Sequence, residues 1–147
     1  MIPTTAEPNN INLKARQKAR ILGMQALYQW HLTEADIADI RQQFYLMNNM
    51  AKCDTVYFDA LLETAPKNIH AIDDAFSSYL DRSFTELNPV ELAILRLGTY
   101  ELLYLDTPYR VVLKEMIRLG SDYGSQDGYK YVNGILHHVA QAKNAPK

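Results

Sequence analysis

The sequence predicts an all-α protein, a compact helical domain of about six or seven helices packed around one central buried helix. Along most of the 147 residues, apolar side chains recur at steps of three and four, which is the period of an amphipathic helix. The segment YRVVL at 109–113 has strand propensity, but its apolar period fits a helix better. The stretch at 88–105 is apolar on almost every side of a helical wheel, and a helix of this kind is buried.

The central segment, NPVELAILRLGTYELLYL, begins with residues that favour a helix start. Asn88 is a good N-cap, Pro89 fits the first helical position, and Glu91 follows the cap by three residues, as in a capping box. The segment is too short, and too often interrupted by charged residues, to span a membrane. We therefore expect it to be the core helix of a soluble domain.

The first third of the chain predicts a tail followed by two helices. Residues 1–12 contain two prolines and no apolar period, so we expect a disordered tail. A first helix is expected at 14–32, with a core stripe formed by Ala15, Ala19, Leu22, Ala26 and Trp30. Thr33 is the expected cap of a second helix, with Asp36 in the capping-box position.

The middle of the chain contains a helix whose continuity is open. Residues 48–53 and 83–87 are expected to be links, and Asp54 is expected to start the helix between them. Pro66 interrupts the apolar pattern, because proline clashes with the carbonyl group four residues earlier. The segment is either two helices or one kinked helix, and we favour the kinked helix because no turn-forming cluster separates the two parts.

Two further helices are expected in the last third. Pro108 is expected just inside the first of them, and Gly124 is expected to end it. Asp127 is a candidate cap for the last helix, which is predicted to run from about residue 129 to residue 142. Residues 143–147 are expected to fray.

The net charge of −2 conceals a segregated pattern. Residues 1–33 carry four basic groups and one acid, residues 34–127 carry eight and sixteen, and residues 128–147 carry three lysines and no acid. If the two basic ends meet in the fold, they form one basic patch on an acidic protein, which indicates a site for a polyanion. Two solvated tails are the alternative, and charge alone does not decide between them.

Four cations lie at the start of the first predicted helix, namely Lys14, Arg16, Lys18 and Arg20. They form two pairs of like charges at a spacing of four residues, and they lie at the helix end where the macrodipole disfavours cations. A bound anion would offset this repulsion. We therefore favour an anion site over the alternative of a solvated basic turn.

A second candidate for nucleic-acid binding opens the last predicted helix, where Lys130 lies between Tyr129 and Tyr131. Aromatic rings stack on unpaired bases, at roughly 1–3 kcal/mol per base, while lysine and arginine neutralise phosphate groups. The pattern favours single-stranded nucleic acid over a duplex, because no helix-turn-helix spacing is evident. The alternative for Tyr131 is core packing against Val132 and Ile135.

No catalytic or metal-binding motif is evident, so the sequence favours a binding protein without a cofactor over an enzyme. The four histidines and the single cysteine, Cys53, have no metal-ligand spacing, and no glycine-rich nucleotide-binding motif occurs. The N-terminus lacks the basic and apolar regions of a secretory signal. We therefore expect a cytoplasmic protein without a membrane segment.

Four segments together resemble the NusB family of bacterial transcription antitermination factors. They are ARQKARILGMQALYQW at 15–30, NPVELAILRLGTYEL at 88–102, TPYRVVLKEMIRLGSDYG at 107–124 and DGYKYVNGILH at 127–137. The segments have the order and spacing of the family, so the resemblance covers nearly the whole chain. It implies two small bundles of three or four helices packed together, and an all-helical RNA-binding domain at 13–142.

The resemblance also implies a function without catalysis. It implies binding to boxA, a short U-rich single-stranded RNA element in nascent ribosomal RNA leaders, together with NusE, a small-subunit ribosomal protein. The heterodimer would join the elongating RNA polymerase complex with other Nus factors and suppress termination. A homodimer that covers the RNA surface is compatible with the sequence, which does not determine the oligomeric state.

Carried over residue by residue, the resemblance places RNA contacts at Arg16, Lys18, Arg20, Lys130 and Tyr131. Gln17 stands where a further arginine is common in the family, and Lys14 is expected to compensate for it. Asp127 occupies a position that affects RNA affinity in the family, and a carboxylate there repels phosphate. Tyr28 and Glu91 match family positions at the NusE face.

Two alternatives remain open on the sequence. One is a helical protein-interaction adaptor without RNA affinity, which would lack the steep salt dependence that phosphate contacts give. The other is the RNA-binding domain of an RNA methyltransferase, which we do not expect because no cofactor fold follows the helical domain in this sequence. RNA binding predicts that Lys18→Glu combined with Arg20→Glu abolishes RNA affinity and leaves the fold intact.

Overall fold

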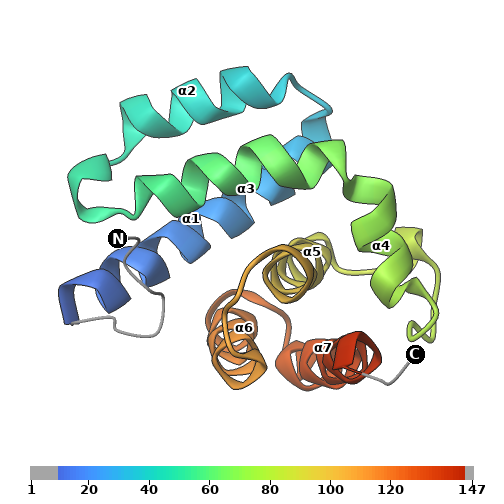
Figure 1. The fold of residues 1–147 in the computed structure, drawn as a ribbon. Coiled ribbons are helices and arrows are strands. Elements are labelled where there is room, and N and C mark those ends of the chain that lie inside the picture. Colours follow the sequence, from blue (N-terminus) through green and yellow to red (C-terminus); the bar gives the residue numbers. More distant parts are fainter. Residues whose placement is uncertain (1–9, 145–147) are drawn as a thin grey trace.

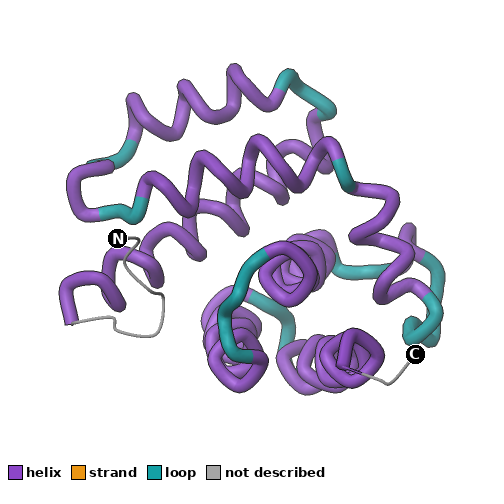
Figure 2. Tube along the Cα trace, viewed as in Figure 1, coloured by secondary structure: helices purple, strands orange, loops and turns teal. Residues whose placement is uncertain are grey.

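The structure, a computed structural model, describes residues 10–144, which form seven α-helices and two short 3₁₀ helices (Figure 1). They are α1 (Asn10–Thr33), α2 (Ile37–Met47), η1 (Met50–Lys52), α3 (Thr55–Lys67), α4 (Ile69–Ser77), η2 (Phe84–Glu86), α5 (Pro89–Tyr104), α6 (Tyr109–Tyr123) and α7 (Gly128–Asn144). Figure 2 shows no strand in this range. The prediction of an all-α fold is confirmed, and no helix among these residues is long and apolar enough to cross a membrane.

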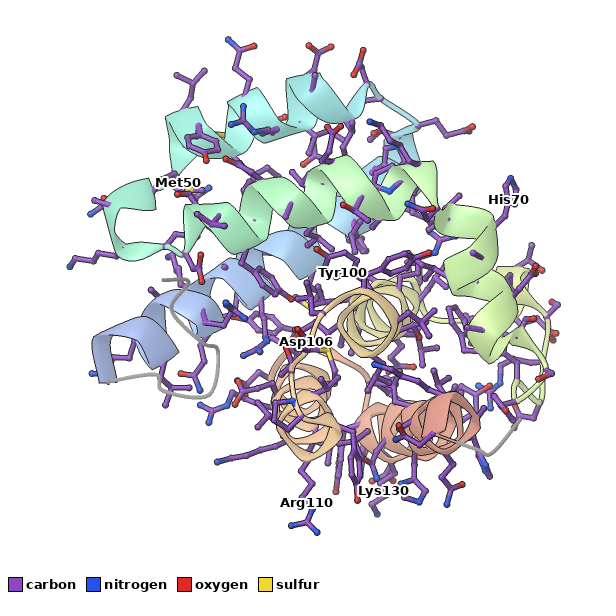
Figure 3. The ribbon with its side chains drawn as sticks, in the orientation of Figure 1. Met50, His70, Tyr100, Asp106, Arg110 and Lys130 are labelled. Carbon is purple, nitrogen blue, oxygen red and sulfur yellow. The ribbon has the colours of Figure 1, made fainter. Side chains whose placement is uncertain are left out.

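The helices form two layers that meet at α5 (Figure 1). In one layer α1, α2 and α3 lie side by side, and in the other α5, α6 and α7 lie together, with α4 between the layers along the chain. α5 packs against α1, α3, α4, α6 and α7, and its residues 91–102 are all buried. Tyr100 lies between the two layers in Figure 3. The prediction of a central buried helix is therefore confirmed, and each large apolar side chain that it buries contributes about 1.5–3 kcal/mol.

The start of α5 shows one cap that the sequence predicted and one contact that it did not. The side-chain oxygen of Asn88 accepts hydrogen bonds from the backbone amides of Val90 and Glu91, at 2.8 and 3.4 Å, and Pro89 is the first helical residue. The predicted capping box is wrong, because the Glu91 carboxylate accepts hydrogen bonds from Ser125. Glu91 turns toward the loop before α7 and is only 5% exposed.

The boundary between α1 and α2 differs from its prediction. α1 begins at Asn10, four residues before the predicted start, and the rest of the predicted tail lies outside the described residues. Thr33 is the last residue of α1, and its hydroxyl donates to the carbonyl oxygen of Gln29 at 2.8 Å. Asp36 is the actual cap of α2, since its carboxylate accepts from the amide of Ala38 at 2.9 Å.

Pro66 does not produce the kinked helix that we favoured from the sequence. α3 ends one residue after the proline, and α4 starts separately at Ile69. The residue between them, Asn68, donates from its backbone and side-chain amides to the carbonyl oxygen of Thr64, at 3.2 and 2.8 Å. The backbone bond is the ordinary bond of a helix to the residue four positions earlier, and the side-chain amide adds a second donor to the same carbonyl group where α3 ends.

The ends of α6 and α7 shift by one or two residues from their predictions. Pro108 is the residue before α6 and not its first residue, whereas Gly124 follows the end of α6 as predicted. α7 begins at Gly128 and continues to Asn144, two residues beyond the predicted end. The final three residues of the predicted C-terminal tail lie outside the described part of the chain.

Arg96 connects α5 to α4 and to the end of α1. Its Nε and Nη2 donate to the two carboxylate oxygens of Asp73 on α4, each at 2.9 Å, and its side chain is 8% exposed. Its Nη1 lies 3.3 Å from Nδ1 of His31 on α1. Burial, together with the positive charge of Arg96, lowers the pKa of His31 below its usual value.

The lowered pKa of His31 predicts a loss of stability in mild acid. In the unfolded chain the pKa stays near the ordinary value of about 6.5, so the unfolded state binds the proton first as the pH falls. Folded-state stability therefore decreases from a pH of about 6.5 downward, until the pH passes the lower pKa of the folded state. We expect the urea midpoint to fall between about pH 7 and pH 5.5, and to fall less in His31→Gln. Equal decreases in both proteins would contradict the prediction.

Candidate nucleic-acid interface

Arg20 is buried inside the protein, although the sequence predicted it as an RNA contact. Its exposed fraction is 2%. Its Nε and Nη2 donate to the two carboxylate oxygens of Glu101 on α5, at 2.6 and 3.0 Å, and the hydroxyl of Tyr57 on α3 donates to the same carboxylate at 2.6 Å. Glu101 is therefore the anion that offsets the charge of Arg20. An RNA contact requires an exposed side chain, which Arg20 does not have.

The electrostatics of this buried cluster keep Arg20 charged. Burial disfavours the charged guanidinium, but the hydrogen bonds to Glu101 and the charge of its carboxylate outweigh burial and raise the pKa of Arg20. Burial and the charge of Glu101 raise the pKa of Tyr57 well above its usual value, so its hydroxyl stays protonated and donates. Glu115 on α6 adds a carboxylate 3.9 Å from Arg20 Nη1. The cluster thus joins α1, α3, α5 and α6.

The remaining cations of α1 divide between the interior and the surface. Arg16 donates from Nε to Asp54 at 2.8 Å, its guanidinium lies 4.8 Å from the ring centroid of Tyr57, and its side chain is 25% exposed. Lys14 is exposed and Lys18 is partly exposed, and neither forms an ion pair within residues 10–144. The surface at the start of α1 therefore presents two lysines and one edge of a guanidinium.

Tyr131 contacts the loop that precedes α5. Its hydroxyl donates to Oδ1 of Asp81 at 2.9 Å, and the Cζ atom of Arg82 lies 4.4 Å from its ring centroid. The ring is partly buried and packs against the hydrophobic core. Tyr131 therefore packs partly against the core, which was the alternative predicted from the sequence, and it also lies at the molecular surface.

Lys130 and Asp127 lie together at the start of α7. The Lys130 side chain is exposed, and its Nζ is 3.4 Å from Oδ1 of Asp127. Figure 3 shows Lys130 at the outer edge of the molecule, on the side of α7 away from α1 and α3. Asp127 lacks the extended backbone of an N-cap residue, since its φ is 65°, so the predicted cap geometry is not present. Its carboxylate instead partly neutralises Lys130.

The two basic groups lie at opposite ends of α5 and do not merge into one patch. The start of α1 packs beside Glu101 in the carboxyl-terminal half of α5, through Arg20. The start of α7 lies beside Glu91 at the amino end of α5, because a side chain at Gly128 would meet the Glu91 carboxylate. Ten helical residues separate these two positions, or about 15 Å along the axis. The two basic groups therefore lie beside different ends of α5.

The described residues contain no arrangement for metal chemistry. Within residues 10–144, no three His, Cys, Asp or Glu side chains gather closely enough to hold a metal ion. The thiol of Cys53 is buried, and burial, helped by the charge of Asp54, raises its pKa, so it is a poor nucleophile. The accessible chemistry of this surface is charge and ring stacking.

Comparison with known proteins identifies the family. Residues 17–141 match the NusB family. The chain belongs to the NusB family. It is 41% identical to "Transcription antitermination protein NusB" of Legionella pneumophila (strain Corby) over 131 residues, which cover 88% of this chain and 89% of that protein. It is 48% identical to the protein of the same name from Pseudomonas savastanoi pv. phaseolicola (strain 1448A / Race 6) over 126 residues, which cover 85% of this chain and 76% of that protein.

A solved structure of NusB from T. maritima has the same fold. Its TM-score to this chain is 0.74 at 32% sequence identity, and the match covers 89% of this chain and 93% of that one. The NusB resemblance that the four sequence segments indicated is therefore confirmed. The assignment of individual residues to RNA or to a partner stays a prediction.

The two residues that the NusB resemblance assigns to the partner face lie in different surroundings. Tyr28 on α1 is partly buried and packs against the core. Glu91 is almost fully buried, and its Oε2 accepts from the amide and the hydroxyl of Ser125, at 2.9 and 2.5 Å. Its carboxylate therefore fixes the loop that carries Asp127. A partner contact at Glu91 stays a prediction, and it would involve only the small exposed part of the side chain.

The position of Gly128 beside Glu91 predicts a strong effect of a single methyl group. A Cβ atom at residue 128 would overlap the Glu91 carboxylate, so Gly128→Ala must displace the carboxylate from Ser125. Overpacking of this kind costs about 1–3 kcal/mol in free energy of unfolding, although alanine is the better helix former. Gly134→Ala in the same helix is the control, because no atom lies within 4 Å of its Cβ position. Urea unfolding should show the first variant destabilised and the second unchanged or stabilised; equal midpoints would disprove the overlap.

Two residues at this surface were missed in the sequence analysis, Asp81 and Arg82. They lie in the segment between α4 and η2 and contact α7 across 50 residues of sequence. No periodic pattern marks them, because the segment has no regular secondary structure. Glu101 was also missed, although the sequence contains a signal for it. A carboxylate in the middle of an apolar helix requires a buried partner, so Glu101 was a reason to look for a buried cation elsewhere in the chain.

Proposed function

We propose that this chain is a transcription antitermination factor that binds the boxA single-stranded RNA element of nascent ribosomal RNA together with NusE. The heterodimer joins the elongating RNA polymerase complex with other Nus factors, and no catalytic step is involved. The observation that carries this proposal is the match of residues 17–141 to the NusB family, with relatives that are named transcription antitermination proteins.

The exposed cations at the start of α1 and at Lys130 on α7 support an RNA surface that includes both layers. Lys14 and Lys18 contact phosphates at one end, with the exposed edge of Arg16, and Lys130 does so at the other end. Such contacts release counterions, so the affinity depends steeply on salt. Single-stranded RNA can contact both of these separate groups of cations, because its backbone is flexible enough to follow a curved protein surface.

The acidic middle of the chain supports a basic protein partner. Residues 34–127 carry eight basic and sixteen acidic groups, so this region attracts a cationic protein such as a ribosomal one. The proposed NusE contact includes Tyr28, whose ring is partly exposed, and the exposed part of Glu91. For the free protein in the cytoplasm, in the absence of RNA and NusE, we propose a homodimer in which each copy covers the RNA surface of the other.

The decisive experiment is a fluorescence titration of a short boxA-like RNA at several salt concentrations, with and without NusE. Binding that NusE strengthens, and that weakens as salt rises, is the expected result. A chain that binds NusE but no RNA at any salt concentration would be a helical adaptor, and the RNA part of the proposal would be wrong. Size-exclusion chromatography of the same samples measures the oligomeric state of the free protein.

The ion pair between Asp127 and Lys130 predicts that removing one carboxylate improves RNA binding. Asp127→Asn removes the repulsion of phosphate and releases Lys130 from its 3.4 Å contact. Asparagine tolerates the left-handed backbone that residue 127 adopts, so the loop is retained. Because exposed pairs are weak, we expect the RNA affinity to rise by up to about fivefold in the same titration. A weaker complex would show that the carboxylate serves mainly to hold the loop.

A further inference from the structure

Arg82, Asp81 and Tyr131 form a hydrogen-bonded cluster next to the start of α7. Arg82 donates from Nε and Nη2 to the two carboxylate oxygens of Asp81, at 2.6 and 3.2 Å. Tyr131 donates from its hydroxyl to Asp81 Oδ1 at 2.9 Å, and its ring lies under the guanidinium at 4.4 Å from Cζ to centroid. One carboxylate thus fixes both the guanidinium and the ring that supports it.

The charge of Arg82 is already matched within this cluster. The hydrogen bonds from Arg82, and then from Tyr131, lower the pKa of Asp81 to about 2, so the carboxylate stays ionised at neutral pH. Glu86 lies nearby and adds a second negative charge, although its carboxylate is engaged by Ser83. A phosphate group approaching Arg82 would therefore meet two acids, and the guanidinium is a poor phosphate ligand here.

The flat surface of the guanidinium remains available. Tyr131 covers one side of it, and the Arg82 side chain is 43% exposed. Single-stranded RNA is commonly bound by stacking unpaired bases on aromatic rings and on arginine planes. A guanidinium that is held in place by a carboxylate and supported by a ring loses little conformational freedom when a base stacks on it.

We propose that Arg82, supported by Tyr131 and held by Asp81, is a stacking platform for one nucleobase of single-stranded RNA. The proposal rests on the proposed RNA-binding function. It adds a residue that stacks on a base, close to the proposed phosphate contact of Lys130. Arg82 acts through its planar shape, and its positive charge is secondary. Tyr131 is a positioning residue, because the base lies on the guanidinium and not on the ring.

The same chain contains a matched control. Arg41 on α2 donates to both carboxylate oxygens of Asp59, at 2.9 and 3.1 Å, and lies 4.7 Å from the ring centroid of Tyr45. Tyr45 donates to the same carboxylate, and the Arg41 side chain is 47% exposed. The chemistry and exposure match those of Arg82, but this cluster lies between α2 and α3, away from α7.

The test compares lysine and alanine variants of the two arginines by titrating boxA-like RNA in the presence of NusE at several salt concentrations. Lysine keeps the charge and removes the plane. For Arg82→Lys and Arg82→Ala we expect affinity to fall by about fivefold to tenfold with the salt slope unchanged. For Arg41→Lys we expect no change. Unaltered affinity of Arg82→Lys, or a slope reduced by about 0.7 in Arg82→Ala, would overturn the proposal in favour of a phosphate contact.

A series of RNAs with one abasic nucleotide each identifies the stacked base. At one position the loss caused by the abasic nucleotide and the loss caused by Arg82→Lys should not add, because both remove the same contact. Additive losses at every position would also overturn the platform. The proposed function fails only if the unchanged protein does not bind the intact RNA, so the two failures are distinguishable. Circular dichroism of each variant checks that the fold is retained.

Discussion

Arg20→Glu is expected to unfold most of the protein at room temperature. The substitution places a carboxylate beside Glu101 and Glu115 in a site that is almost inaccessible to water, and it removes the only cation that contacts them both among the described residues. Breaking a buried ion pair by removing one partner costs about 3–5 kcal/mol, and reversing the charge adds repulsion. Near the lower end of the range of about 5–15 kcal/mol that natural domains have, a loss of this size leaves little or no stability.

Urea unfolding followed by circular dichroism measures this effect. The control is Arg41→Glu, which reverses the charge of a matched but exposed Arg–Asp pair and should cost about 1 kcal/mol or less. The expectation from the sequence, that Lys18→Glu with Arg20→Glu leaves the fold intact, is wrong for this reason: Arg20 is a core residue. A urea midpoint for Arg20→Glu equal to that of the unchanged protein would show that the buried pair contributes nothing to stability.

Lys14→Glu combined with Lys18→Glu is expected to weaken RNA binding by about 100-fold near 0.1 M salt, with stability retained. Both side chains reach solvent and form no ion pair with a described residue, so their loss removes phosphate contacts without breaking internal ones. The replacements also add two negative charges close to the RNA backbone. The slope of log affinity against log salt should decrease by about 0.7 for each phosphate contact that is lost.

The matched control for this pair is Lys67→Glu combined with Arg41→Glu, which changes the net charge equally. Both residues are exposed, and they lie on α3 and α2. We expect the control to retain RNA affinity within about threefold, since neither residue lies on α1 or α7 and salt screens exposed charges. If the two double variants lost affinity equally, the net charge would govern binding and the start of α1 would not be the site.

The sequence predicted the elements that depend on local chemistry. The apolar surface of the 88–105 segment and its Asn88 cap predicted a buried central helix, and the structure confirms both. The core stripe of the first helix was identified at Ala19, Leu22 and Ala26, which are buried. These features are encoded within a few residues of each other, so periodicity and capping preferences are sufficient to find them.

Features that depend on distant contacts could not be predicted in the same way. Arg20 looked like a surface cation because its partner, Glu101, lies 81 residues later in the chain. Pro66 was interpreted as a kink because no turn-forming cluster follows it, although α3 ends at Lys67 and α4 starts separately at Ile69. Charge alone left open whether the two basic ends meet, and the contacts of α5 with Arg20 and with the start of α7 show that they lie beside different ends of this helix. For Arg20 and for the two basic ends, the deciding contacts join residues that no short window of sequence contains, whereas the end of α3 is a local feature.

The burial of α5 between two layers also determines how the molecule loses its structure. Residues 91–102 belong to the core of both layers, because α5 packs against α1 and α3 as well as against α6 and α7. Removing α5 would expose the apolar faces of α1 and α7 at the same time, so we expect the two layers to unfold together. We expect a single cooperative transition in which both ends of the candidate RNA face disappear together. A substitution that destabilises one layer is therefore expected to destabilise the whole domain, without a folded intermediate that keeps one end of the candidate RNA face.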